Sequence, residues 1–144
     1  MNKGFGSTLL ALTARIHFPF MLLFAIYVVI HGHYSPGGGF QGGILLTMAM
    51  ILLDLIWGAK NPLRPSHAFL VVMGCLGVCV YFLIGMIALL RSKPFLDYSA
   101  LTTSTEAVGH VRAFGSLGIE MGVTITVFAT SYLIYQVLRG DHSS

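Results

Sequence analysis

The sequence predicts an all-α integral membrane protein with four transmembrane helices, and three observations carry this prediction. The chain has 144 residues, of which 56% are hydrophobic and 9% are charged, and its mean hydropathy is +0.83. Soluble domains carry roughly a quarter of charged residues, so a soluble core of this size would not hide so much apolar surface. Four apolar runs are each long enough to cross a bilayer, which takes about 20 residues. We place them at about 8–31, 36–57, 68–90 and 112–138, so that residues 1–144 form a single membrane domain.

The first run, 8–31, is apolar apart from Arg15 and His17, which lie near its N-terminal end. Long basic side chains near the end of a spanning helix can reach the membrane surface. Pro19 removes one backbone hydrogen bond from this helix and predicts a kink, which neighbouring helices can accommodate.

The second run follows a stretch rich in glycine. Ser35 can cap a helix, and Pro36 suits the first helical position, so a helix over 36–57 is expected. The glycines from Gly37 to Gly43 form either the first turns of a weak helix or an unwound segment at membrane depth. Irregular backbone at that depth is tolerated only against protein or a water-filled cavity. We therefore expect this segment to make a close contact with another subunit.

The third run, 68–90, contains no charged residue, and the fourth, 112–138, is interrupted by a single acid, Glu120. Between them, 91–111 is the longest polar connection, expected to lie on the membrane surface and to be partly helical. Four spans place both termini on one side of the membrane.

Lysines and arginines accumulate in cytoplasmic loops, and this rule predicts that both termini are cytoplasmic. More cations fall on the side of the termini, and the glycine-rich stretch on the other side has none. The cations are Lys3, Arg15, Lys60, Arg64 and Arg139 on the side of the termini, and Arg91, Lys93 and Arg112 opposite.

Arg15 and Asp54 are candidates for an ion pair, because both are expected near the inner ends of neighbouring helices. Charges within a membrane usually face a partner or a wet cavity. His17 is expected beside them. The pair would serve either as a salt bridge that fixes the helix hairpin or as part of an ion path.

Glu120 is a second candidate, because it lies between Gly118 and Gly122, whose small size exposes its carboxylate to another helix. Buried carboxylates can take up and release protons near neutral pH, as a proton or sodium relay requires. The alternative is a carboxylate that is hydrogen-bonded to the helix of a neighbouring subunit. The sequence leaves both open.

His31 and His33 could bind a metal or transfer protons, or they could be surface histidines at the membrane boundary. Haem ligation is not expected, because only His17 lies well inside a span. We expect no metal site and no cofactor.

The glycines themselves favour helix packing. Gly39 and Gly43 share the Gly-x-x-x-Gly spacing of Gly118 and Gly122, and this spacing allows helices to approach closely in lipid. A phosphate-binding loop is not expected, because no lysine follows the glycines.

Residues 32–43 carry the pattern G-H-x-x-P-G-G-G-F-x-G-G, followed by an apolar helix. This pattern resembles the MnhB/MrpB family, one of the small membrane subunits of the multisubunit Na⁺/H⁺ antiporters, which has relatives in energy-converting membrane-bound hydrogenases. The positions that match the pattern are His33, Pro36, Gly37, Gly38, Gly39, Phe40, Gly42 and Gly43.

The resemblance implies a small multi-pass subunit of a prokaryotic inner-membrane complex that exchanges cations for protons. Its expected partners are large subunits like those of respiratory complex I, small membrane subunits and the lipid bilayer, with no nucleic acid. It would be a transporter subunit rather than an enzyme, needed for assembly and able to line the ion path. The alternatives are a purely structural scaffold and the equivalent subunit of a hydrogenase-type redox ion pump.

Overall fold

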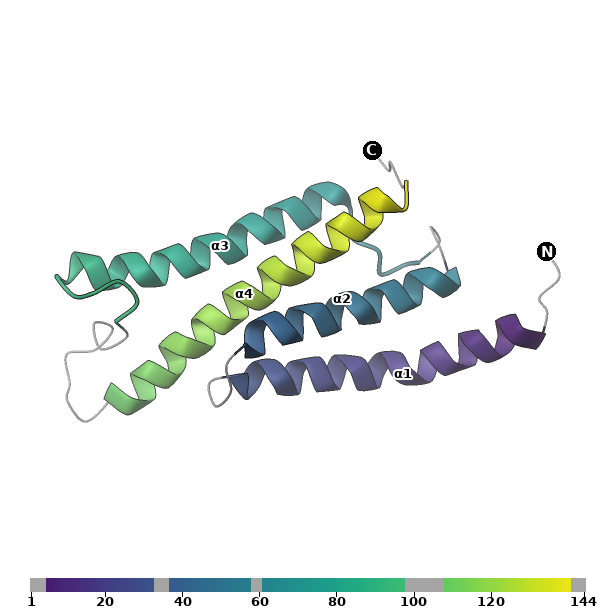
Figure 1. Ribbon diagram of the computed structural model, residues 1–144, viewed down its shortest axis with the longest axis horizontal. Helices are drawn as coiled ribbons and strands as arrows, with labels where there is room; N and C mark the ends of the chain where they lie inside the picture. Colours follow the sequence, from purple (N-terminus) through teal and green to yellow (C-terminus); the bar gives the residue numbers. More distant parts are fainter. Residues whose placement is uncertain (1–4, 33–36, 58–60, 98–107, 141–144) are drawn as a thin grey trace.

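The computed structural model describes residues 5–32, 37–57, 61–97 and 108–140, with only the backbone described at 5–7 and 108–112. It contains α1 (Phe5–Ile30), α2 (Gly38–Trp57), α3 (His67–Leu90) and α4 (Val108–Leu138), shown in Figure 1. Each helix includes a stretch that is long and apolar enough to cross a membrane. All regular structure in the described ranges is helical, which confirms the predicted all-α membrane fold with four spanning helices.

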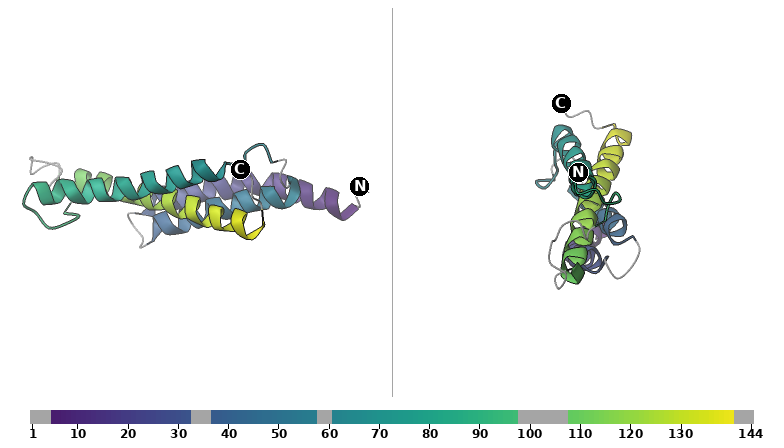
Figure 2. Two further views of the ribbon diagram at one scale, coloured as in Figure 1. Left: turned by 90° about the horizontal axis from the view of Figure 1, so that it is seen from above. Right: turned by 90° about the vertical axis from the view of Figure 1, so that its left-hand side faces the viewer.

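The helices form a row in the order α1, α2, α4, α3. Extensive contacts join α1 to α2, α2 to α4 and α3 to α4, while within the described ranges α3 touches neither α1 nor α2. The end-on view in Figure 2 shows this row as one elongated layer. The helices α2 and α4 lie at its centre, and α1 and α3 form its two edges. The described chain begins and ends at the same end of the layer (Figure 1).

Local backbone geometry shifts two of the expected helix boundaries. Gly37 has a φ of +95°, which a right-handed helix cannot contain, so α2 begins at Gly38 and not at residue 36. The helix α4 begins at Val108, which makes the last part of the expected surface connection helical. Ser66 caps α3, because its hydroxyl accepts a hydrogen bond from the Phe69 amide at 3.3 Å.

The core lies along α4, on its contacts with α2 and with α3. Tyr132 is fully buried there and stacks on Phe128 with the ring centroids 5.9 Å apart. The other buried hydrophobic side chains of this cluster are Met50, Leu53, Leu70 and Ala129. This core holds α2 against α4 and fixes the relative positions of their polar residues.

Candidate functional site

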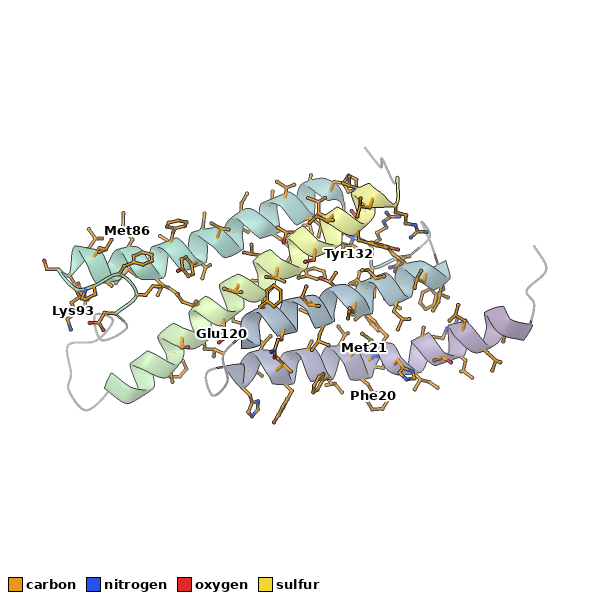
Figure 3. The ribbon with its side chains drawn as sticks, viewed as in Figure 1. Phe20, Met21, Met86, Lys93, Glu120 and Tyr132 are labelled. Atoms are coloured by element: carbon orange, nitrogen blue, oxygen red, sulfur yellow. The ribbon has the colours of Figure 1, made fainter. Side chains whose placement is uncertain are left out.

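The side chain of Glu120 lies on three glycines, of which two belong to α2 and one follows the end of α1. A Cβ built at Gly32 would collide with the Glu120 carboxylate, and one at Gly38 would stand 2.8 Å from its Oε2. A Cβ at Gly39 would stand 2.6 Å from the Glu120 carbonyl oxygen. Figure 3 shows Glu120 on α4 beside the start of α2. We call Gly32, Gly38 and Gly39 the glycine cradle.

The carboxylate in this cradle is not compensated by the described part of the chain. Its Oε2 atom is buried and has no hydrogen-bond partner. The nearby Thr124 hydroxyl donates to the Glu120 carbonyl at 2.7 Å, not to the carboxylate. An ion pair among the described residues lies elsewhere, between Arg139 and Asp54. Glu120 as a whole is half-buried, and Oε2 is its buried atom without a partner. Because a buried polar atom without a hydrogen bond is costly, Oε2 is suited to a proton, a cation or a donor from outside the described residues.

The remaining glycines of the motif pack within this chain. A Cβ at Gly42 would meet Val29 of α1, and one at Gly43 would stand 2.9 Å from the Thr124 carbonyl of α4. Together with Gly38 and Gly39, both are buried against the chain's own helices. The expectation that this segment as a whole faces another subunit is therefore wrong for these four glycines, whereas the Phe40 side chain is 57% exposed.

Gly118 and Gly122 face α3 and not the glycines of α2. A Cβ at Gly122 would stand 2.9 Å from the Gly77 carbonyl, and one at Gly118 would stand 3.0 Å from Cδ1 of Ile84. The two Gly-x-x-x-Gly pairs thus serve different helix contacts, on either side of Glu120.

Asp54 forms a second polar centre near the other end of α2. It is fully buried. Its carboxylate accepts hydrogen bonds from Asn61 Nδ2 and from the Tyr132 hydroxyl, both at 2.7 Å. Arg139 Nη1 lies 3.9 Å from Asp54 Oδ2 and donates to the Asp54 carbonyl at 3.4 Å. These contacts tie the end of α2 to the following loop and to the end of α4.

The predicted ion pair between Arg15 and Asp54 is wrong. The Arg15 guanidinium lies over the Trp57 ring, 5.7 Å from its centroid. Asp54 faces α4, where Arg139 supplies the cation. His17 is exposed, and its Nδ1 donates to the Thr13 carbonyl at 2.8 Å, so its described hydrogen bond is local to α1.

His31 is exposed at the end of α1, where its Nδ1 donates to the Tyr27 carbonyl at 3.0 Å and its ring stacks on that of Tyr27. His33 and Pro36 lie outside the described residues, and Gly37 is an exposed turn residue. In the described ranges, no three His, Cys, Asp or Glu side chains come close enough to hold a metal ion.

The sequence alone does not reveal which residues contact the carboxylates of Glu120 and Asp54. It does not single out Gly32 as a place for Glu120, or Asn61 as a donor to Asp54. One signal is available on α4: Tyr132, Gln136 and Arg139 recur at helical spacing and therefore share one face. Gln136 is also buried, and its Nε2 donates to the Pro65 carbonyl at 3.1 Å.

Comparison with known proteins places this arrangement in context. The family model for domains related to the MnhB subunit of Na⁺/H⁺ antiporter matches residues 9–133. Similar proteins from Staphylococcus aureus strains MRSA252 and Newman both bear the name "Putative antiporter subunit mnhB2". Each is 27% identical over 123 residues, which cover 85% of this chain and 87% of the relative. No solved structure matches the chain.

Proposed function

Because this chain belongs to the family of domains related to the MnhB subunit of Na⁺/H⁺ antiporters, we propose that it is a small multi-pass subunit of a multisubunit cation/proton antiporter in the cell membrane. The four membrane-spanning helices support this proposal. So do relatives that are named as antiporter subunits. The partners would be the other membrane subunits of that complex, and the chain would act as a transporter subunit with no covalent chemistry of its own.

Within that complex, Glu120 is the residue that joins the ion path. The observation that carries this step is the buried Glu120 Oε2, which has no donor among the described residues and sits on the glycine cradle. Such an oxygen can hold a proton or a cation, and exchange of one for the other is the elementary event of cation/proton antiport. Intramembrane acids of this kind commonly mark ion and proton pathways.

Asp54 has a different role, because its carboxylate already accepts hydrogen bonds from Asn61 and Tyr132 and lies near Arg139. These contacts occupy both oxygens of the carboxylate. Asp54 is therefore a structural anchor that joins α2 to α4.

A scaffold role is the second candidate, and the open row of helices supports it. The edge helices α1 and α3 expose long apolar faces, on which partner helices can pack. In that case Glu120 would receive a hydrogen bond from a neighbouring subunit and would carry no ion.

Replacement of Glu120 by glutamine separates the two candidates, because glutamine keeps the size of the side chain but cannot take up a cation or a proton. Na⁺/H⁺ exchange is measured in inverted membrane vesicles that contain the complete complex, and assembly is measured by co-purification of the subunits. We expect E120Q to assemble normally and to lose exchange at least about tenfold. The matched control is Asp97→Asn, which neutralises a carboxylate in the α3–α4 connection and should leave exchange unchanged.

Unchanged exchange in E120Q would exclude Glu120 from the ion path. Loss of assembly together with exchange would favour the scaffold role.

A further inference from the structure

A groove lies between the first half of α1 and the end of α2. It is lined by one cation, one amide and large apolar side chains, which include Arg15, Phe18, Leu53, Trp57, Asn61 and Leu63. The groove borders the Asp54 centre, because Asn61, whose Nδ2 donates to the Asp54 carboxylate, also lines it. Arg15 and Trp57, which also line the groove, take no part in the contacts described for either polar centre.

The Arg15 guanidinium in this groove is available to an anion. It is exposed, and it lies over the Trp57 ring, 5.7 Å from the ring centroid. A cation–π contact with an aromatic ring does not use the N–H groups of a guanidinium as hydrogen-bond donors, so they can still donate to an anion. Among the described residues, the nearby acid Asp54 pairs with Arg139 and not with Arg15.

The groove lies at the level where the apolar span of α2 ends, seven residues inside the Thr8–Ile30 span of α1. Trp57 is the last residue of α2, and Asn61 and Leu63 belong to the loop that leads to α3. Tryptophan is enriched at the boundary between the hydrocarbon and the headgroups. Phe18 and Leu53 lie farther along their helices, on the hydrocarbon side of this level. The groove thus offers a cation at the level of Trp57 and an apolar surface below it.

We propose that this groove binds an anionic phospholipid, with its phosphate on Arg15 and an acyl chain against Phe18 and Trp57. The charge at this end of the molecule favours an anionic ligand, since Arg15, Arg64 and Arg139 lie here with Asp54 as the described acid. Basic pockets between transmembrane helices are suited to acidic lipid headgroups. The proposal is independent of any role of Glu120 in ion exchange.

Trp57 provides the test, because it is the single tryptophan of the chain and lines the groove. The full-length chain is reconstituted in phosphatidylcholine vesicles that contain an equal fraction of either brominated phosphatidylglycerol or brominated phosphatidylcholine. Bromine on an acyl chain quenches tryptophan fluorescence only at near contact. We expect the quenching of Trp57 to show that phosphatidylglycerol occupies the groove about fivefold more than phosphatidylcholine does. This ratio corresponds to about 1 kcal/mol for one basic side chain at an anionic surface.

The variant Arg15→Gln should lose this preference, whereas Arg15→Lys should keep part of it. Arg91→Gln is the matched control, because it removes the same charge at the opposite end of α3 and should keep the preference in full. Equal quenching by brominated phosphatidylcholine in all variants shows that the α1–α2 hairpin is intact.

Three results would overturn the proposal. If the parent chain shows no preference for phosphatidylglycerol, the groove is a site for a protein partner and not for a lipid. If the preference survives Arg15→Gln, it arises from the general positive charge at this end of the molecule. Competition by inorganic phosphate in the buffer would assign Arg15 to a free anion instead of a lipid.

Discussion

Gly39 of α2 lies directly on the backbone of Glu120 of α4. A Cβ at Gly39 would stand 2.6 Å from the Glu120 carbonyl oxygen and 3.1 Å from its Cα. A backbone cannot move out of the way as a side chain can, so the two helices could keep this distance only with glycine at position 39. The close approach also brings the Glu120 side chain over Gly32 and Gly38. The glycine motif and the acidic residue are thus parts of one arrangement.

Replacement of Gly39 by alanine should therefore force α2 and α4 apart. We expect a loss of about 1–3 kcal/mol in the free energy of unfolding, as is typical of an overpacked contact. This loss is measured by unfolding the full chain in mixed detergent micelles and monitoring the helical circular dichroism signal. The control is Gly74→Ala, whose Cβ would meet its nearest neighbour at 3.8 Å, an ordinary contact. Equal stability of the two variants would contradict the close contact.

Replacement of Gly32 by alanine should act on the carboxylate and not on the helices. The atoms that a Cβ at Gly32 would meet all belong to the end of the Glu120 side chain, which can move. We expect the stability to change by less than about 1 kcal/mol. Na⁺/H⁺ exchange by the assembled complex should nevertheless fall severalfold, because the carboxylate leaves its cradle. Exchange at the parental rate in Gly32→Ala would show that the position of the carboxylate in the cradle is irrelevant to transport.

Replacement of Tyr132 by phenylalanine removes a hydrogen bond to the buried carboxylate of Asp54. Hydrogen bonds to charged groups contribute about 1.5–3 kcal/mol, and we expect a loss of stability in this range. The same detergent unfolding experiment measures it. Tyr135→Phe is the control, because the Tyr135 hydroxyl accepts from exposed Arg139 at 3.2 Å and its loss should cost less. A variant Tyr132→Phe as stable as the parent would mean that Asp54 does not depend on this donor.

Helix number and approximate position could be predicted from the sequence, because a bilayer imposes a minimum length on every apolar run. The depth of a residue follows from its distance to the helix end, and Arg15 and Asp54 do lie near the same end. The direction of a side chain around the helix depends on which helices are neighbours. Since α2 packs on α4, which is distant in sequence, Asp54 meets Arg139 instead of Arg15.

The partners of the glycines could not be predicted for the same reason, since they depend on which helices are neighbours. Their abundance before an apolar run predicts a close contact, but the partner of that contact follows only from the order of helices in the row. The neighbours of Gly38 and Gly39 come from α1 and α4, and one of them is the only acid of the α4 span. A sequence shows both features and does not show that they meet.

Site-resolved labelling with a hydrophobic carbodiimide tests most directly whether Glu120 exchanges a proton for a cation. The reagent adds to a protonated carboxyl group in an apolar environment, and the labelled residues of the assembled complex are identified by mass spectrometry of its peptides. We predict labelling of Glu120 that sodium ions suppress, with no labelling of Asp54, whose carboxylate is held by Asn61, Tyr132 and Arg139. Absence of label on Glu120, or labelling that sodium does not change, would contradict a role of this carboxylate in exchange.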